Sequence, residues 1–402
     1  MKEDSVLQGI RILDLGSDIS APYTARLLAD NGAEVIKIEP PGGDTSRRKG
    51  AFLNHKPDPE TSSLFIALNT SKKGITLDIT KTKGRELLLK MMEMSDAMIE
   101  NYDPDYLASL NLGYDTLSKH NAKLVLTSIT NFGQEGPYRN WDTSEGAIQA
   151  FSGLMTISGE PDRSPIKTGL PLAQYTAGLT GFASTLAAVY HAQLTGEGQH
   201  VDIALCDAIA ANIDQLSLAW SFDYPDKEMR SRYGLRRGPL EGLYQCRDGF
   251  IGCTTTDFSE VKRLATIVSP DLDYPDKFGN FYYGSVDNED EMEAILIPWF
   301  LEHDKRPIME MTQGVGLAYS YVADIKDLVE ANPQLSTRNS LVELEHPRIG
   351  NYLACAPSNR YIGPSFKLKP APLLSQHTEE ILTSWLGLNR NEIATLKTEG
   401  VI

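Results

Sequence analysis

Short apolar segments that alternate with helical patterns dominate the first half of the chain. Residues 10–15 and 34–39 predict two strands, and between them Pro22 predicts the first turn of a helix that Gly32 ends. The alternation continues with strand-like or extended segments at 74–78, 97–100, 123–129 and 200–205, and with a helical pattern at 83–94. Strands that alternate with helices predict a mainly parallel sheet covered on both faces, which is an α/β fold.

A long uncharged segment follows this pattern. Residues 176–194 are rich in Ala, Gly, Leu and Thr, which predicts a helix packed tightly in the interior. Beyond about residue 221 the elements become shorter, and the acidic run 287–291 predicts the start of a helix. We therefore expect three parts, which are a large domain at 1–221, a smaller domain at 222–330 and a C-terminal segment at 331–402 with helices near 378–386 and 390–399.

The composition narrows the class of protein. The 402 residues include 38 Lys and Arg against 54 Asp and Glu, a net charge of −16, which argues against a nucleic-acid binder because phosphate backbones require clustered basic residues. The sequence contains no run of about 18 apolar residues that would predict a membrane span, and its N-terminus lacks the pattern of a signal peptide. The four cysteines have no CxxC spacing, so we expect reduced core residues of a cytoplasmic protein without a metal site.

Several catalytic motifs are missing from the sequence. It contains no G-x-G-x-x-G after the first strand, no G-x-x-x-x-G-K-[ST], no G-x-S-x-G and no H-E-x-x-H. The seven histidines are scattered without the spacing of metal ligands. Nucleotide hydrolysis by a phosphate loop, serine-hydrolase chemistry and zinc proteolysis therefore have no support.

A series of ordered segments, dense over the first half of the chain, resembles a known family. They include Leu68-Asn69-Thr70-Ser71-Lys72-Lys73-Gly74 and Glu100-Asn101-Tyr102, and in full they are residues 7–15, 21–23, 27–39, 68–78, 100–102, 112–114, 131–138, 152–155, 159–162 and 194–202. The resemblance is to the family III CoA-transferases, the formyl-CoA and carnitine CoA-transferase type, which also includes α-methylacyl-CoA racemases.

The resemblance implies both a fold and a mechanism. The expected fold is a dimer of interlocked ring-like subunits, each with a Rossmann-like large domain, a smaller α/β domain and a final segment that returns to the large domain. In the implied mechanism an aspartate carboxylate attacks the acyl-CoA carbonyl, and the released thiolate then forms an enzyme-bound aspartyl-CoA thioester that passes CoA to an acid. CoA thioesters are substrates here, and no cofactor is bound covalently.

The chain departs from the family at the nucleophile. In the stretch Gly169 to Gly178 the position of the family's aspartate holds Gln174, whose neutral amide cannot form the anhydride. The racemase mechanism also lacks its catalytic residues here, because the position of the racemase histidine holds Ser144. We therefore expect no catalytic residue in this chain, with the adjacent Glu145 as the one residue that could rescue a racemase.

The expected CoA contacts are also altered. The matched segments suggest Lys72, Lys73, Asn101 and Asn131 as CoA-binding residues. The arginine that commonly pairs with CoA phosphates corresponds to a position near Ser109, and Asp103 and Asp105 lie close by in the sequence. Because carboxylates repel phosphates, these departures argue against a CoA site in this chain.

A full-length chain without the nucleophile suggests a partner that has it. The resemblance is to the Asp-lacking subunit of two-subunit enzymes, the succinyl-CoA:benzylsuccinate CoA-transferases of anaerobic toluene degradation. The leading hypothesis is thus a heteromer with an Asp-bearing paralogue that moves CoA from an acyl-CoA such as succinyl-CoA to a carboxylic acid. The alternatives are a self-sufficient transferase that uses Glu145, Asp142 or Glu160, and a non-enzymatic acyl-CoA binding homodimer. Aromatic residues that could line an acceptor pocket, although core packing is favoured, are Tyr233, Tyr244, Phe281, Tyr282 and Tyr283.

Overall fold

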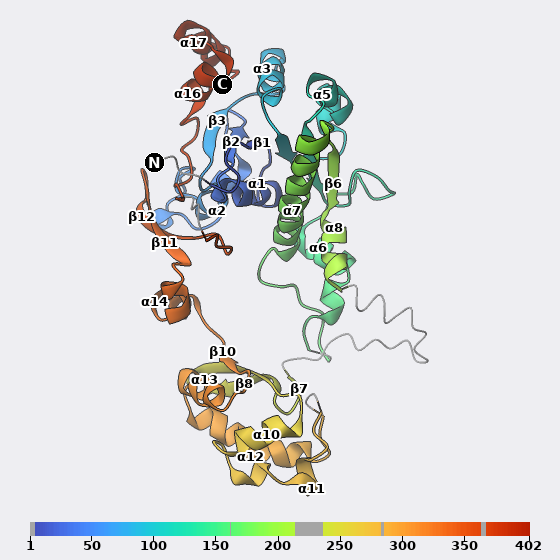
Figure 1. Ribbon diagram of the computed structural model, residues 1–402, viewed down its shortest axis with the longest axis vertical. Coiled ribbons are helices and arrows are strands. Elements are labelled where there is room, and N and C mark those ends of the chain that lie inside the picture. The colour runs from blue at the N-terminus through green and yellow to red at the C-terminus, as the bar shows by residue number, and fades with distance from the viewer. Residues whose placement is uncertain (1–4, 161, 214–235, 283–284, 363–366) are drawn as a thin grey trace. The chain divides into compact units, whose positions relative to one another are not determined.

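The chain divides into two compact units. The computed structural model describes residues 5–160, 162–213, 236–282, 285–362 and 367–402 (Figure 1). Of these, the large unit contains 5–154, 168–213 and 334–402, and the small unit contains 155–167 and 236–333. The boundary expected between 221 and 222 lies outside the described residues. The segment 155–167, which the sequence analysis assigned to the large domain, belongs to the small unit.

A parallel sheet forms the centre of the large unit and confirms the predicted α/β fold. Its strand order is β3-β2-β1-β4-β5-β6, with the strands β1 (Arg11–Asp14), β2 (Glu34–Glu39), β3 (Lys73–Thr76), β4 (Ala97–Glu100), β5 (Val125–Thr130) and β6 (His200–Ala204). All six coincide with segments predicted from the sequence. The direction of winding reverses between β1 and β4, and in such sheets ligands bind outside the carboxyl ends of the strands at this point.

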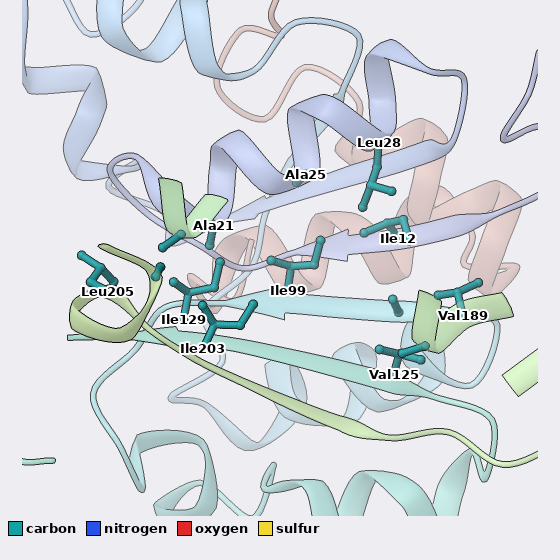
Figure 2. Packing of buried hydrophobic residues seen from close by; sticks show 14 of the residues in the cluster. Ile12, Ala21, Ala25, Leu28, Ile99, Val125, Ile129, Val189, Ile203 and Leu205 are labelled. Atoms are coloured by element: carbon teal, nitrogen blue, oxygen red, sulfur yellow. The ribbon is translucent and has the colours of Figure 1, made fainter. Parts of the chain in front are cut away.

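Helices cover both faces of this sheet. One face packs against α1 (Ser20–Asp30) and α7 (Leu172–Thr195), and Figure 2 shows Ile12 and Ile99 of the sheet beside Ala25 of α1 in this core. The second core, on the other strand faces, includes side chains of α3 (Thr82–Met92), α5 (Tyr114–His120), α16 (Thr378–Leu386) and α17 (Arg390–Thr398). Among the described residues, no helix combines the length and apolar composition that a membrane crossing requires.

The small residues of α7 allow it to approach α1 closely. A Cβ added at Gly178 would lie 2.9 Å from the Ser20 carbonyl oxygen, and one at Gly181 would lie 2.5 Å from Thr24 Oγ1. The Thr24 hydroxyl uses this proximity to donate a hydrogen bond of 2.9 Å to the Gly178 carbonyl. The predicted helix is thus confirmed, and its glycines have a packing reason, but the expectation that it lies wholly in the interior is wrong, because residues such as Leu179 and Tyr190 are exposed.

Shorter elements complete the large unit. They include α2 (Ser63–Leu68), α4 (Tyr106–Ser109), α6 (Glu145–Phe151), α8 (Leu205–Ala210) and the antiparallel pair β11 (Leu341–His346) and β12 (Gly350–Cys355). Because side chains alternate along a strand, Ala354 of β12 is buried and its neighbour Cys355 is exposed. The expectation of four core cysteines is therefore wrong for Cys355, while Cys206, Cys246 and Cys253 are buried.

The small unit has its own antiparallel sheet. Its strand order is β10-β9-β8-β7, with β7 (Arg236–Gly238), β8 (Glu241–Cys246), β9 (Gly249–Thr254) and β10 (Ser320–Tyr321). The accompanying helices include α10 (Phe258–Ala265), α11 (Pro275–Phe278), α12 (Glu289–Glu302), α13 (Lys305–Gly314) and α14 (Ile325–Glu330), and α12 begins within the predicted acidic run. Of the aromatic residues named above, Tyr244 and Phe281 are buried in this core, Tyr282 is exposed, and Tyr233 and Tyr283 lie outside the described residues.

Two glycines after α7 make the entry into β6 possible, and one of them offers a test of the packing. Gly196 ends α7 in the left-handed region (φ 83°), and a Cβ at Gly198 would lie 2.0 Å from the Leu124 carbonyl oxygen.

Gly198→Ala should therefore lower the free energy of unfolding by about 2–3 kcal/mol, because the backbone beside β5 must shift. Urea denaturation measures this. The control Gly169→Ala, whose added methyl meets no atom within 4 Å, should change stability by less than about 1 kcal/mol. Equal losses of stability in Gly198→Ala and Gly169→Ala would contradict this explanation.

Candidate functional site

A polar cavity lies at the carboxyl ends of the central strands, where the winding of the sheet reverses. We call it the strand-end cavity; its volume is about 290 Å³, and all of its lining residues belong to the large unit. Its polar lining includes Ser20, Asn101, Thr130, Asn131, Arg139 and Gln174. Of the predicted site residues, the fold thus brings together Asn101, Asn131 and Gln174, although they are far apart in the sequence.

Asn101 holds the loop that leads into α1. Its Oδ1 accepts a hydrogen bond of 2.8 Å from the Ser17 amide, and its Nδ2 donates one of 2.8 Å to the Ser17 carbonyl. Asn101 directly follows β4, and the loop it binds follows β1. This pair of bonds therefore joins the ends of two neighbouring strands and places the first residue of α1, Ser20, at the cavity.

Gln174 lies in the first turn of α7, and Glu145 binds the start of that helix. The Glu145 carboxylate accepts hydrogen bonds from the amides of Ala173 (2.9 Å) and Gln174 (3.4 Å), and from Gln149 Nε2 (2.7 Å). Because this carboxylate serves as a helix cap, its geometry does not favour the proton-transfer role considered for it. Ser144 is exposed at the N-cap of α6, where its Oγ accepts from the Ala147 amide (3.3 Å).

Lys72 lies inside the fold. Its Nζ donates hydrogen bonds of 2.8 Å each to Asp14 Oδ2, the Pro22 carbonyl and Asn69 Oδ1. Burial lowers the pKa of Lys72 to about 8, despite the opposing effect of Asp14. Three partners occupy the three protons of this ammonium group, so the CoA-binding role expected for Lys72 has no support from its position.

Lys73 and Ser109 also lie outside the strand-end cavity. Lys73 pairs with Glu34 (3.2 Å) and Glu380 (2.9 Å) and lines a separate cleft of about 940 Å³ near the start of β2. Ser109 is exposed on α4, where its hydroxyl donates to the Tyr106 carbonyl (2.6 Å). The expected CoA contacts are therefore distributed over two separate parts of the large unit.

The residues of the cavity that the sequence analysis missed include Thr130 and Arg139. Thr130 is the last residue of β5, and Arg139 lies in the loop between β5 and α6. A signal for Thr130 was present, because residues at the carboxyl ends of parallel strands converge at the same edge of a sheet. Arg139 had no comparable signal, since a loop of irregular structure places it.

Glu100, at the end of β4, is the most perturbed acid near the cavity. It is buried, and burial raises its pKa to about 7, with a smaller contribution of the same sign from Asp202. Hydrogen bonds from Ser128 and the Tyr102 amide act in the opposite direction, and Ser128 Oγ also contacts His200 Nε2 at 2.9 Å. Glu100 lines a neighbouring cavity of about 360 Å³ together with His200, Asp103 and other residues.

Comparison with known proteins identifies the family. Residues 7–378 match the sequence model of CoA-transferase family III. The chain is 30% identical to the succinyl-CoA:glutarate CoA-transferase of Homo sapiens, over 98% of this chain and 90% of that protein. It is 29% identical to the succinyl-CoA–L-malate CoA-transferase beta subunit of Chloroflexus aurantiacus, over 98% of each. Its fold is similar to that of a CAIB/BAIF family protein from Brucella suis, with a TM-score of 0.83 and 24% identity over 95% of this chain and all of that one.

The chain therefore belongs to CoA-transferase family III, as the resemblance implied. Both curated relatives are named as succinyl-CoA-dependent CoA-transferases, and one of them is named as a beta subunit.

The raised pKa of Glu100 predicts a pH-dependent stability. Between the ordinary pKa of 4.5 and about 7 the folded state binds this proton more tightly than the unfolded state, so stability should fall as the pH rises through that window. Glu100→Gln removes the ionisation. At pH 8 the variant should be more stable than the wild type by on the order of 3 kcal/mol, and at pH 4.5 the two should be nearly equal.

Urea unfolding at several pH values measures the difference, with the exposed Glu86→Gln as the matched control. A stability difference between Glu100→Gln and the wild type that stays the same at every pH would contradict the assignment.

Proposed function

We propose that the chain is the subunit without a nucleophile in a heteromeric CoA-transferase. The observation that carries this proposal is Gln174, which lines the strand-end cavity at the position where the family resemblance expects the aspartate. Glu145, which accepts a hydrogen bond from the Gln174 amide, is engaged as the cap of α7. An Asp-bearing paralogue would then supply the covalent step.

The chemistry explains why an amide cannot replace the aspartate. The carboxylate attacks the acyl-CoA carbonyl, the carbon–sulfur bond breaks, and a mixed anhydride and CoA thiolate result. The thiolate then attacks the aspartyl carbonyl, and the acyl group leaves as a carboxylate. An amide nitrogen is a weak nucleophile, and the Gln174 carbonyl is not attacked by a thiolate under these conditions. The absence of the aspartate therefore removes the covalent pathway itself.

An exposed apolar stripe on α7 supports the proposed association with a second chain. Leu179, Ala183, Ala187, Tyr190 and Leu194 recur at helical spacing along one side of α7, and all five are exposed. A stripe of this kind is typical of a face that another surface covers. It agrees with the interlocked dimer that the family resemblance implies.

The proposed substrates are an acyl-CoA donor such as succinyl-CoA and a carboxylic acid acceptor. The names of the two curated relatives support succinyl-CoA as donor. The resemblance to the benzylsuccinate enzymes of anaerobic toluene degradation makes benzylsuccinate our candidate acceptor.

Affinity purification from the chain's own host tests the heteromer. Native mass spectrometry should find a complex with an equal amount of a paralogue of similar size that carries Asp at the position aligned with Gln174. A purification from cells without the affinity tag is the control for non-specific capture. Homodimers alone would overturn the proposal, and a homodimer that holds CoA esters without transferring CoA would instead support a binding protein.

A second candidate is a self-sufficient transferase in which Asp142 is the nucleophile. The observation that favours it is the position of Asp142, whose exposed side chain lines the same cavity as Gln174. Of the other carboxylates considered, Glu145 serves as a cap, and Glu160 belongs to the small unit.

Asp142→Asn distinguishes the two candidates. If the heteromer proposal is correct, the isolated wild-type chain and this variant should show the same background rate of CoA transfer, and hydroxylamine trapping with peptide mapping should find no modified carboxylate. If Asp142 is the nucleophile, the rate of CoA transfer should fall at least about a hundredfold in the variant. Peptide mapping should then find a labelled peptide in the wild type and none in the variant. Asp103→Asn, which changes another acid of the cavity, is the matched control.

A further inference from the structure

The C-terminal segment of the chain covers the outer edge of β3. This strand is the last in the order of the six-stranded sheet, so the backbone groups that point away from β2 need other partners. The Gly74 carbonyl accepts a hydrogen bond of 2.9 Å from the His377 amide. The Gly74 amide donates to His377 Nδ1 at 3.0 Å, and the Thr76 amide donates to Thr378 Oγ1 at 3.2 Å. Two side chains thus accept the hydrogen bonds that strand carbonyls would accept in a longer sheet.

Residues 369–378, which we call the edge strap, lie close against β3. A Cβ added at Gly74 would lie 2.9 Å from Pro372 Cγ, so the glycine permits this approach. The strap also forms part of the wall of the cleft of about 940 Å³ near the start of β2. Beyond the strap, α16 is held independently, because Ile381 and Leu382 are fully buried in the second core. The strap can therefore loosen from β3 while α16 stays in place.

The hydrogen bond from the Gly74 amide requires a neutral His377. An acceptor needs a lone pair, and Nδ1 has one only in the tautomer whose proton is on Nε2. Protonation of the ring places a hydrogen on both nitrogens, so two N–H groups would then face each other. The hydrogen bond would be lost, and the buried Gly74 amide would lose its partner.

The charged groups around His377 come from several elements. Burial, Lys73 at the start of β3 and Lys369 of the strap lower the pKa of His377 below its ordinary value of 6.5, and Glu380 of α16 acts in the opposite direction. Lys73 is itself paired with Glu34 and Glu380. The remaining charged residues that line the cleft are Arg11, Lys72, Asp96 and Glu345. The ring is therefore neutral at pH 7 and becomes charged only in a more acidic medium.

We propose that His377 is a proton-sensitive latch that holds the edge strap on β3. In its neutral form the ring accepts the Gly74 amide hydrogen. Protonation breaks this bond and loosens the strap, which exposes the edge of the sheet and opens one wall of the cleft. Because the free histidine takes up its proton near pH 6.5, the latch is closed above that pH and opens as the pH falls below it. This device does not depend on the heteromer proposal, since all its residues belong to the large unit.

Hydrogen exchange with mass spectrometry on the purified full-length chain tests the latch locally. Peptides that span β3 report the amides of Gly74 and Thr76. After correction for the intrinsic pH dependence, these amides should exchange at least about fivefold faster at pH 5 than at pH 7.5. A peptide that spans β1, at the centre of the sheet, should show no such change. An unchanged corrected rate at β3, or an equal increase at β1, would overturn the proposal.

Two substitutions of His377 separate the latch from a general effect of acid. In His377→Asn the side-chain oxygen is as many bonds from the backbone as Nδ1, so it accepts from Gly74 without titrating, and β3 should stay protected at both pH values. His377→Leu has no acceptor, so exchange at β3 should be fast at both. His120→Asn, on α5, is the matched control and should keep the acid response of the wild type.

An acid response in His377→Asn as large as in the wild type would refute the latch, and so would full protection of β3 in His377→Leu at pH 7.5. The expected loosening in acid is opposite in sign to the effect of Glu100, whose protonation stabilises the fold. Neither outcome depends on co-purification with a paralogue, so failure of the latch and failure of the heteromer proposal are distinguishable.

Discussion

The buried carboxylate of Asp14 holds together the strand ends of the large unit. It lies at the end of β1, and its Oδ2 is 2.8 Å from Lys72 Nζ and 3.8 Å from Lys37 Nζ, while Oδ1 accepts from the Gly16 amide at 3.0 Å. Lys37 belongs to β2 and Lys72 directly precedes β3, so one carboxylate joins three neighbouring strands. Removal of one partner from a buried group of this kind costs about 3–5 kcal/mol, because it leaves an uncompensated charge.

This network connects the interior of the sheet to the cavity. Lys37 Nζ also donates to the Gly16 carbonyl and pairs with Asp44 at 2.7 Å, so its position helps to hold the loop that Asn101 binds through Ser17. Burial alone would lower the pKa of Lys37, but the carboxylates of Asp14, Asp44 and Glu39 raise it well above its usual value. None of these groups is Gln174. The scaffold of the site is therefore separate from the position of the nucleophile, and a chain can lose the nucleophile and still keep the fold.

The sequence predicted the sheet well and the site only in part. Strands and the helices between them were recognisable because apolar periodicity reports burial on the sheet and helix faces. Asn101, Asn131 and Gln174 could be named because they lie in motifs of the family. Lys72 was misjudged, since a lysine next to a strand is usually solvated and its burial depends on Asp14, a residue distant in the sequence. Arg139 could not be found, because its partner Asp105 lies in a separate loop and no local pattern joins the two.

The identity of residue 174 decides which chemistry the cavity can support. A carboxylate at this position can attack an acyl-CoA carbonyl, and an amide cannot, because its nitrogen is a weak nucleophile. Replacement of Asp by Gln removes one negative charge beside Arg139 and the N-terminus of α1 while it preserves polarity and approximate shape. If the proposed heteromer is correct, this chain keeps the fold and an Asp-bearing paralogue supplies the nucleophile. Under that proposal the substitution removes only the covalent step, because the buried charges of Asp14, Lys37 and Lys72 that hold the strand ends do not involve residue 174.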